Sequence, residues 1–388
     1  MKILFVTEVY HPTINGVVIS IDTFKKELEK RGHQVYILAP ENPRSNQDEK
    51  NVFRTPSLPL NKDLDYFLAL PNQITFETVK MIAPDIIHTH HIWTLAEFAL
   101  RCARELNIPL VATYHTLMEE YSHKVPVLSK FSPTKNAIKS FIRHKSRKFC
   151  NQLDAVISPS LAMKKIMRRY GITQPIEVIS TGIKLSDFKF HNKNYILKKH
   201  KISAPGARLL LFVGRLAYEK NVSMLIESFR RINQQISHTY LIILGSGPQE
   251  NTYQNLVKKL NLAKNVIMPG FVDPDETKKY FGTCDLFCFP SITDTQGIVI
   301  LEAMAGGAVP VAVNKLGPTD IINSGYNGFL VANNQQKFTE AIIKLLQNPK
   351  LLQKFRKNGL AKARHFTSVK QTDKLIDLYQ KIQNARAK

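Results

Sequence analysis

The chain has 388 residues, of which 44% are hydrophobic and 22% charged, so it is long enough for two globular domains and too apolar to be disordered. Its 54 Lys and Arg against 31 Asp and Glu give a formal net charge of +23, which predicts anionic partners such as nucleotide phosphates, nucleic acid or an acidic membrane surface. Four scattered cysteines exclude a disulfide scaffold, and we interpret Cys284 and Cys288 as core residues.

The first apolar run, residues 3–6, stops at Thr7-Glu8 and is too short for a signal peptide. No apolar stretch approaches the roughly 18 residues of a membrane span. The sequence therefore predicts a reducing, cytosolic compartment.

The chain opens with a strand–loop–helix–strand pattern, with strands at residues 3–6 and 35–39 and a helix at 19–30. The loop contains Asn15-Gly16 but lacks G-x-G-x-x-G, which disfavours a dehydrogenase. Gly16 would let the backbone approach a ligand at the positive end of the helix, although an ordinary turn remains the alternative.

Histidines follow two further predicted strands, residues 85–89 and 110–114. Strand alternation places His88 and His90 on one face and His91 off it, and no nearby Cys or Asp completes a metal set. We therefore expect these histidines to form a polar lining of a cleft, with no metal. His115 follows the second strand and is a candidate active-site residue, with a structural role as the alternative.

The most basic region is residues 124–169, with twelve Lys and Arg against one acid, Asp154. Four cations recur every four residues: Lys135, Lys139, Arg143 and Arg147. Four apolar residues are predicted to gather on another face: Ile138, Phe141, Ile142 and Phe149. This pattern is typical of an interfacial membrane helix. The alternatives are a core-packing helix with a solvated basic face and a nucleic-acid site, which no binding motif supports.

Strands at 154–158 and 176–179, with a helix at 159–170 between them, complete the first half, and the polar stretch 181–206 is predicted to be an interdomain linker. A strand at 208–213 then restarts the pattern and ends at Gly214-Arg215, with Lys220 five residues on. The cations of Arg215 and Lys220, close to a glycine, could hold a diphosphate. The alternative is that both are solvated surface charges without a ligand.

The strand at 241–244 leads into Gly245-Ser246-Gly247, a weak dinucleotide signal because the third glycine is absent. Residues 266–271 predict a strand and a turn that contains Gly270 and Phe271. Helical patterns at 336–346, 351–363 and 368–385 follow.

Residues 286–313 read as strand, loop, helix and strand, the unit of a parallel α/β sheet. Asp294 lies in the loop, Glu302 lies inside the helix, and the helix would direct free N–H groups from Gln296, Gly297 and Ile298 at the same space. The alternative is that Asp294 is an ordinary N-cap and Glu302 a solvent-facing charge.

This stretch resembles the acid-x7-Glu element of family-four retaining glycosyltransferases with the GT-B fold. The matching residues are Pro290, Ser291, Gly297, Glu302-Ala303-Met304-Ala305, Gly307, Pro310 and Val311. The chain departs from the pattern where Asp294 replaces the usual Glu, and at Ala308-Val309, which is one residue longer before the proline.

The resemblance implies an α/β GT-B architecture of two Rossmann-like domains facing across a cleft. An acceptor-binding domain would span residues 1–187 and a nucleotide-sugar-binding domain residues 188–366, with a last helix at 367–388 crossing back to the first domain. It also implies retaining sugar transfer from a nucleotide-diphosphate donor with no metal or other cofactor.

The resemblance further implies roles for single residues. Asn15 and Gly16 would form the diphosphate loop, where the usual pair is Gly-Gly, and His115 would contact the donor sugar. Gly214-Arg215 and Lys220 match the family element GRL-x-x-x-K, which makes the two cations a diphosphate clamp. The remaining donor contacts would be Gly270 and Phe271 near the base, Asp294 on sugar hydroxyls, Glu302 on ribose hydroxyls, and the amides of Gln296, Gly297 and Ile298.

Residues 113–125 and 170–183, together with Thr295-Gln296-Gly297, resemble bacterial diacylglycerol glucosyltransferases. With the basic helix, this predicts a peripheral enzyme on the inner face of the cytoplasmic membrane that moves glucose from UDP-glucose to diacylglycerol. Its membrane contacts would be Lys135, Lys139, Phe141, Arg143 and Arg147. The alternatives are a soluble or polysaccharide-building transferase that uses GDP-mannose, a sugar-nucleotide epimerase, and a non-enzymatic ligand-binding protein. Nucleic acid is not an expected partner.

Overall fold

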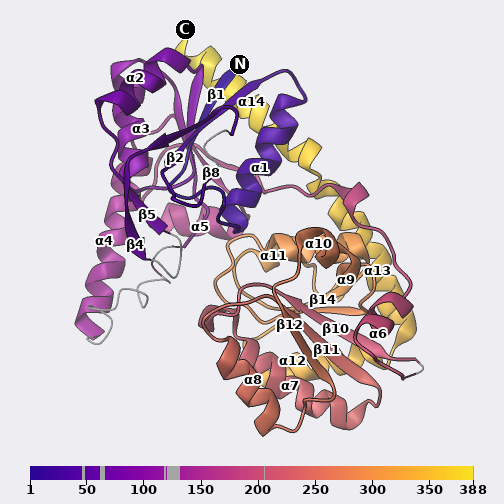
Figure 1. Ribbon diagram of the computed structural model, residues 1–388. Helices are drawn as coiled ribbons and strands as arrows, with labels where there is room; N and C mark the ends of the chain where they lie inside the picture. Colours follow the sequence, from indigo (N-terminus) through magenta and orange to yellow (C-terminus); the bar gives the residue numbers. More distant parts are fainter. Residues whose placement is uncertain (46–48, 62–65, 118, 120–131, 205, 388) are drawn as a thin grey trace. The chain divides into compact units, whose positions relative to one another are not determined.

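Two parallel β-sheets organise the chain, whose computed structural model describes residues 1–45, 49–61, 66–117, 119, 132–204 and 206–387. Each sheet lies in its own unit of the chain (Figure 1). The first unit consists of Met1–Gly182 together with Ser368–Lys388, and the second of Ile183–Thr367.

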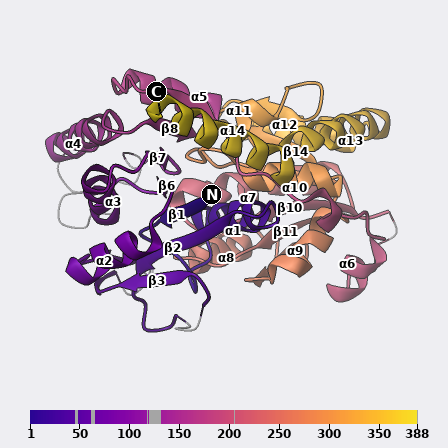
Figure 2. The same ribbon diagram turned by 90° about the horizontal axis from the view of Figure 1, so that it is seen from above.

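The sheet of the first unit has seven parallel strands in the order β3-β2-β1-β6-β7-β8-β9, and Figure 2 shows β1, β2 and β3 side by side. The strands are β1 (Lys2–Val6), β2 (Gln34–Pro40), β3 (Val52–Thr55), β6 (Ile86–Thr89), β7 (Leu110–Thr113), β8 (Ala155–Ser158) and β9 (Ile176–Val178). A separate antiparallel hairpin pairs β4 (Ser57–Asn61) with β5 (Tyr66–Ala69). The helices of this unit are α1 (Gly16–Glu29), α2 (Gln73–Ile82), α3 (Thr94–Glu105), α4 (Ser132–Cys150), α5 (Leu161–Arg169) and α14 (Ser368–Arg386).

The sheet of the second unit has six parallel strands in the order β12-β11-β10-β13-β14-β15. They are β10 (Arg208–Val213), β11 (Thr239–Leu244), β12 (Val266–Gly270), β13 (Leu286–Phe289), β14 (Val309–Val313) and β15 (Phe329–Val331). The α-helices are α6 (Asn194–Lys199), α7 (Val222–Gln235), α8 (Glu250–Lys259), α9 (Pro274–Phe281), α10 (Ile298–Gly306), α11 (Pro318–Ile321), α12 (Gln335–Leu346) and α13 (Pro349–Ala363). Short 3₁₀ turns are η2 (Leu185–Asp187), η3 (Tyr218–Lys220) and η4 (Arg364–Phe366).

Strand β10 shows why these segments read as continuous apolar runs. Leu210 and Phe212 pack into one core with residues of α7 and α12, whereas Leu209 and Leu211 pack into the opposite core with residues of α10. Because helices cover both faces of the parallel sheet, the side chains that point to either face of the strand are buried. The predicted strands 208–213, 286–289 and 309–313 are confirmed at the same bounds.

Residues 181–206, predicted to be the interdomain linker, contain the boundary between the two units after Gly182, but most of the stretch packs onto the second unit. It contains η2 and α6, and Ile196 and Ile202 are buried in the core of that unit. Lys193 Nζ also lies 2.6 and 2.7 Å from the two carboxylate oxygens of the buried Asp285. The lysines between Ile196 and Ile202 led to the prediction of a polar segment, but both isoleucine side chains are buried.

Candidate functional site

A row of histidines lies where the central strands of the first sheet end. Strands β1, β6 and β7 are neighbours, so their carboxyl ends bring Phe5, His88, His90 and His115 together. The Nδ1 atom of His90 lies 2.9 Å from Nε2 of His115. The two ring nitrogens of His88 instead lie 2.7 Å from the hydroxyls of Tyr379 and Thr113.

His88 and His90 are each only 1% exposed, so the expectation that they line a cleft is wrong. They stack on each other with ring centroids 4.4 Å apart, and both meet Phe5 edge-on. Burial lowers the pKa of His88 to about 3 and the pKa values of His90 and His115 well below 6.5, so all three rings are neutral near pH 7. Within the described ranges, no group of three or more His, Cys, Asp or Glu could hold a metal ion.

The loop after β1 presents an open backbone at Gly16. A Cβ atom added there would meet no heavy atom within 4 Å. The side-chain oxygen of Asn15 accepts hydrogen bonds from the amides of Val17 and Val18, at 2.9 and 3.0 Å, and so caps α1. The first amides of this helix are therefore already paired with Asn15, and Gly16 is the open point of the loop.

The second unit brings together two of the predicted residues, Lys220 and Asp294. The ammonium nitrogen of Lys220, at the end of η3, lies 2.8 Å from both carboxylate oxygens of Asp294 in the loop after β13. Asp294 is not the N-cap of α10, since that position belongs to Gly297, whose φ is +76°. Arg215, two residues after β10, is exposed.

Glycines let the loops after β10 and β11 pack against each other. A Cβ on Gly245 would lie 2.0 Å from the carbonyl oxygen of Gly214, and one on Gly247 would lie 2.6 Å from that of Leu216. The amide of Leu216 also donates to the carbonyl of Ser246 at 2.9 Å. The G-x-G element therefore supports the loop that carries Arg215, which explains it without a dinucleotide.

The turn after β12 completes this edge of the second sheet. Gly270 has a φ of +81°, its carbonyl accepts a hydrogen bond from the amide of Gly245 at 2.8 Å, and Phe271 beyond it is 62% exposed. Because β12, β11, β10 and β13 are neighbours in that order, Phe271, Gly245, Arg215 and Asp294 follow the carboxyl ends of adjacent strands.

Helix α10 starts at Ile298, directly after the loop that carries Asp294. Gln296 is nearly buried, because Gly317 packs so closely that an added Cβ would lie 2.4 Å from the Gln296 backbone. Glu302 lies in the second turn, where burial raises the pKa of its carboxyl to about 7 and Lys278 opposes the rise only in part. Glu302 is therefore not an ordinary solvated charge.

The basic helix α4, the magenta helix at the edge of the first unit in Figure 1, does not keep its predicted apolar face together. Ile142 and Phe149 are buried, as the core-packing alternative predicts, whereas Phe141 is 61% exposed. Arg143 forms an ion pair with Glu119 and lies over the ring of Tyr170. Arg147 is exposed and Lys139 partly so. The Lys135 side chain lies outside the described residues, as do residues 118 and 120–125 of the acceptor-like stretch.

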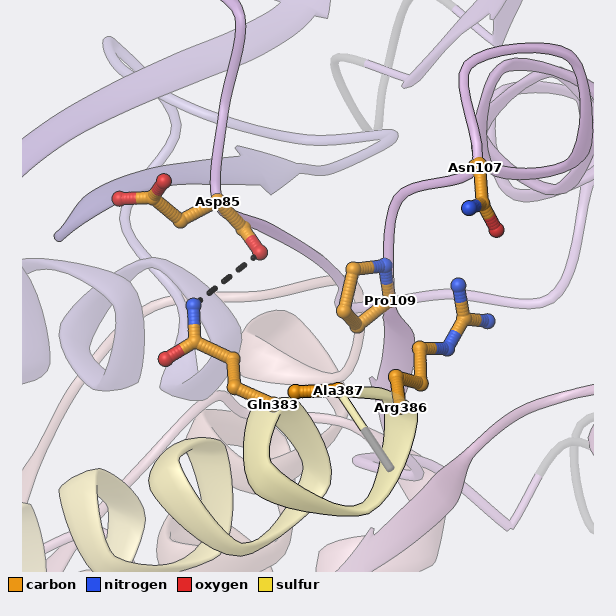
Figure 3. Close-up of a pocket in the computed structure, with 6 residues that line it drawn as sticks. All are labelled: Asp85, Asn107, Pro109, Gln383, Arg386 and Ala387. Carbon is orange, nitrogen blue, oxygen red and sulfur yellow. Dashed lines mark hydrogen bonds between the residues drawn. The ribbon is translucent and has the colours of Figure 1, made fainter.

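The cavity drawn in Figure 3, of about 390 Å³, lies at the opposite end of the first sheet. Asp85 and Pro109, which line it, directly precede β6 and β7, and the Gln383 side chain donates to the Asp85 carbonyl at 3.4 Å. Arg386 is already paired with both carboxylate oxygens of Asp154, at 2.8 and 2.9 Å. Ligands of parallel sheets bind at the carboxyl ends of the strands, so this cavity is not the candidate site.

Comparisons with known proteins bear on both units. Residues 14–187 match the family model described as Glycosyltransferase Family 4, and residues 196–362 match that described as Glycosyl transferases group 1. The chain is 32% identical over 319 residues to the alpha-monoglucosyldiacylglycerol synthase of Streptococcus pneumoniae, covering 80% of this chain and 71% of that protein. It is 27% identical over 368 residues to the synthase of the same name from Acholeplasma laidlawii, covering 92% of each chain.

More distant similarity extends to other transferases. A GDP-mannose-dependent alpha-mannosyltransferase of Corynebacterium glutamicum is 27% identical over 339 residues, covering 85% of this chain and 76% of that protein. Among solved structures, Anabaena Alr3699/HepE in complex with UDP superposes with a TM-score of 0.79 at 18% identity, covering 98% of this chain and 100% of the other. Sucrose-phosphate synthase from Thermosynechococcus elongatus superposes with a TM-score of 0.78 at 19% identity, covering 99% and 100%. At these identities the structural likeness shows the fold.

Proposed function

Because the chain belongs to the family-four and group 1 glycosyltransferases, with their GT-B fold of two Rossmann-like domains, we propose that it moves glucose from UDP-glucose to diacylglycerol. The observation that carries the lipid acceptor is the 32% identity, over most of the chain, to a protein named as a monoglucosyldiacylglycerol synthase. The synthase of Acholeplasma laidlawii supports it across 92% of both chains.

The donor diphosphate binds in this proposal at the carboxyl edge of the second sheet. Cleavage of the glycosidic bond leaves an additional negative charge on the diphosphate oxygen, and Arg215 and Lys220 offset that charge. Lys220 is paired with Asp294 in the structure, so diphosphate binding would exchange one anionic partner of the ammonium group for another. Asp294 is then released to accept hydrogen bonds from sugar hydroxyls.

The remaining donor contacts follow the family resemblance. Glu302 accepts hydrogen bonds from ribose hydroxyls, the Gly270-Phe271 turn lies near the base, and His115 contacts the donor sugar. The amides of Gln296, Gly297 and Ile298 and the loop of Asn15 and Gly16 complete the contacts to sugar and diphosphate.

Transfer proceeds with retention, on the same face of the sugar from which the diphosphate departs. The bond from the anomeric carbon to the diphosphate oxygen breaks as that carbon bonds the acceptor oxygen, and the departing oxygen takes the acceptor's proton. The proposal includes no metal or other cofactor.

The outer face of α4 supports a peripheral membrane location. The phenyl ring of Phe141 and the cation of Arg147 are both exposed on α4, and such groups suit the boundary between anionic headgroups and acyl chains. No helix in the described part of the chain is long and apolar enough to cross a membrane. In this proposal the enzyme binds the cytoplasmic leaflet and reaches its lipid acceptor from there.

A mannosyl transfer from GDP-mannose is the second candidate, favoured by the 27% identity to a GDP-mannose-dependent transferase. The two functions separate in one assay, which offers UDP-glucose or GDP-mannose with and without anionic vesicles that contain diacylglycerol. Glucolipid formed only with vesicles supports the first proposal. Mannose transferred to a soluble acceptor without vesicles overturns it.

The role of α4 has its own test, in which vesicle co-sedimentation is compared among variants. Phe141→Ser and Arg147→Glu are expected to weaken binding to anionic vesicles, by roughly 1 kcal/mol or more for the charge reversal. Lys258→Glu, an equal charge change at an exposed position of α8, is the matched control. Equal losses in Arg147→Glu and Lys258→Glu, with no loss in Phe141→Ser, would show that net charge alone attracts the chain to the vesicles.

A further inference from the structure

His90 lies one residue past β6, and His115 two residues past the neighbouring β7. The backbone amide of His90 donates to the carbonyl of Val6 at 2.9 Å, which extends the sheet and fixes the position of the ring. The Phe5 ring meets the His90 ring edge-on with centroids 4.9 Å apart, and the His88 ring stacks on it, so neighbouring rings restrict the plane of the His90 ring.

The contact between His90 and His115 has the geometry of a good hydrogen bond. Its length is 2.9 Å, the ring planes differ by 18°, and the centroids lie 5.2 Å apart. That centroid separation is close to the bond length plus the two ring radii, so the bond runs along the line of centres and near both ring planes. An imidazole lone pair lies in the ring plane, which makes this a directed N–H···N bond rather than a stacking contact.

The other nitrogen of His90 decides which ring donates. His90 Nε2 is buried and has no hydrogen-bond partner among the residues that the structure describes. Orphaned buried N–H groups are rare, so the proton of the neutral His90 ring belongs on Nδ1, where it is donated to Nε2 of His115. The proton of His115 must then be on its own Nδ1.

We infer that His90 is a positioning residue, which holds His115 as the neutral Nδ1–H tautomer so that His115 donates a hydrogen bond to an oxygen of the donor sugar. This inference rests on the proposed function, in which His115 contacts that sugar. Protonation of His115 at Nε2 would set two N–H groups against each other, or move the His90 proton to its buried, unpartnered nitrogen. Burial lowers the pKa values of both rings, which keeps them neutral, whereas the hydrogen bond selects the tautomer.

The test is the ¹⁵N spectrum of the full chain labelled at histidine, with the His115 signals assigned by their loss in His115→Gln. The expected wild-type spectrum shows a protonated Nδ1 and an unprotonated Nε2 at His115. In His90→Leu the bond is lost, and His115 is expected to change to the Nε2–H form that free imidazoles prefer. His90→Asn, whose amide occupies the position of Nδ1, is expected to preserve the wild-type tautomer.

Sugar transfer is measured in parallel. His90→Leu is expected to lower kcat/KM at least about tenfold, whereas His90→Asn stays near the wild-type value. Tyr379→Phe, which removes a hydroxyl from His88 and leaves the His90–His115 bond intact, is the matched control and keeps both the tautomer and the rate.

A wild-type spectrum with the proton on Nε2 of His115 overturns the inference, even if His90→Leu fails to fold. An unchanged tautomer in a folded His90→Leu variant overturns it as well. A wild-type chain that transfers no sugar overturns the proposed function, and with it the role of this bond in transfer, while the spectrum still decides the tautomer.

Discussion

The residues at the carboxyl edges of the two parallel sheets differ in charge. In the first unit the edge carries the neutral imidazoles of His88, His90 and His115, the first two of them buried, which hydrogen-bond to hydroxyls and to one another. In the second it carries a partly exposed pair of opposite charges, Lys220 and Asp294, among loops with little side-chain bulk at Gly214, Gly245 and Gly270. Neutral donors and acceptors suit the hydroxyls of a sugar, whereas a cation and open backbone suit a diphosphate.

The largest expected effect comes from removal of the cation in the second unit. Lys220→Met leaves the leaving diphosphate with one cation fewer, and kcat is expected to fall roughly 10²- to 10³-fold. The measurement is the initial rate of UDP release at saturating donor, with circular dichroism to confirm folding. Lys258→Met, at an exposed position of α8, should leave the rate unchanged. A Lys220→Met rate within a few-fold of wild type would contradict the role of Lys220 in stabilising the diphosphate. The charge difference between the two sheet edges would then have no consequence for transfer.

The second prediction compares a glycine loop from each unit. Gly245→Ala is expected to lower the free energy of unfolding by about 2–3 kcal/mol, because its Cβ would meet the Gly214 carbonyl at 2.0 Å and its φ is +130°. Gly16→Ala should change stability by less than about 1 kcal/mol, because its Cβ meets nothing within 4 Å and it begins α1. Urea denaturation followed by circular dichroism measures both, and equal midpoints would refute the difference between the loops.

The third prediction concerns pH. With its carboxyl pKa raised to about 7, Glu302 is mostly protonated at pH 6 and ionised at pH 8, and only the ionised form accepts hydrogen bonds from both ribose hydroxyls. Affinity for UDP is therefore expected to weaken about tenfold from pH 8 to pH 6. Calorimetric titrations at several pH values measure this, and Glu302→Gln should bind weakly with no such dependence.

The raised pKa of Glu302 affects stability in the opposite direction, since a higher pH strengthens UDP binding but lowers the free energy of unfolding. The folded state retains the Glu302 proton between pH 4.5 and about 7, where the unfolded chain has lost it. The contribution of Glu302 to the free energy of unfolding therefore falls as pH rises through that window. A Glu302→Gln variant that shows the wild-type pH dependence of both binding and stability would exclude this carboxyl as the cause.

The smallest expected effect tests the exchange of partners at Lys220. Asp294→Asn removes the carboxylate that competes with the diphosphate, so UDP is expected to bind roughly fivefold tighter at low salt while sugar transfer falls. The gain should shrink in high salt, since the pair is partly exposed. Glu340→Gln, which removes one partner of an exposed pair on α12, serves as the control. Weaker UDP binding by Asp294→Asn would show that the carboxylate positions Lys220 rather than competing with the diphosphate.

The sequence alone determined those elements whose local pattern is unambiguous. Strands such as 208–213 and 286–289 are uninterrupted apolar runs bounded by glycine, proline or acid, and the αL glycine Gly307 ends α10 as its position predicted. The hairpin β4–β5 and helix α2 received no prediction, because residues 57–82 show no clean period. Phe141 and Ile142 were predicted to share one face of α4, but the first is exposed and the second buried, since one residue shifts a side chain by about 100° around a helix.

Only the tertiary structure decided which polar residues meet. Lys220 and Asp294 are separated by 74 positions and become partners because β10 and β13 are neighbours in the sheet. His90 and His115 meet in the same way at the ends of β6 and β7, and no periodicity in either segment reveals it. Local patterns report which face of an element is apolar, but strand order is set by packing between distant segments. The tautomer of His115 therefore depends on His90, for which the sequence predicted only a position in the polar lining of a cleft.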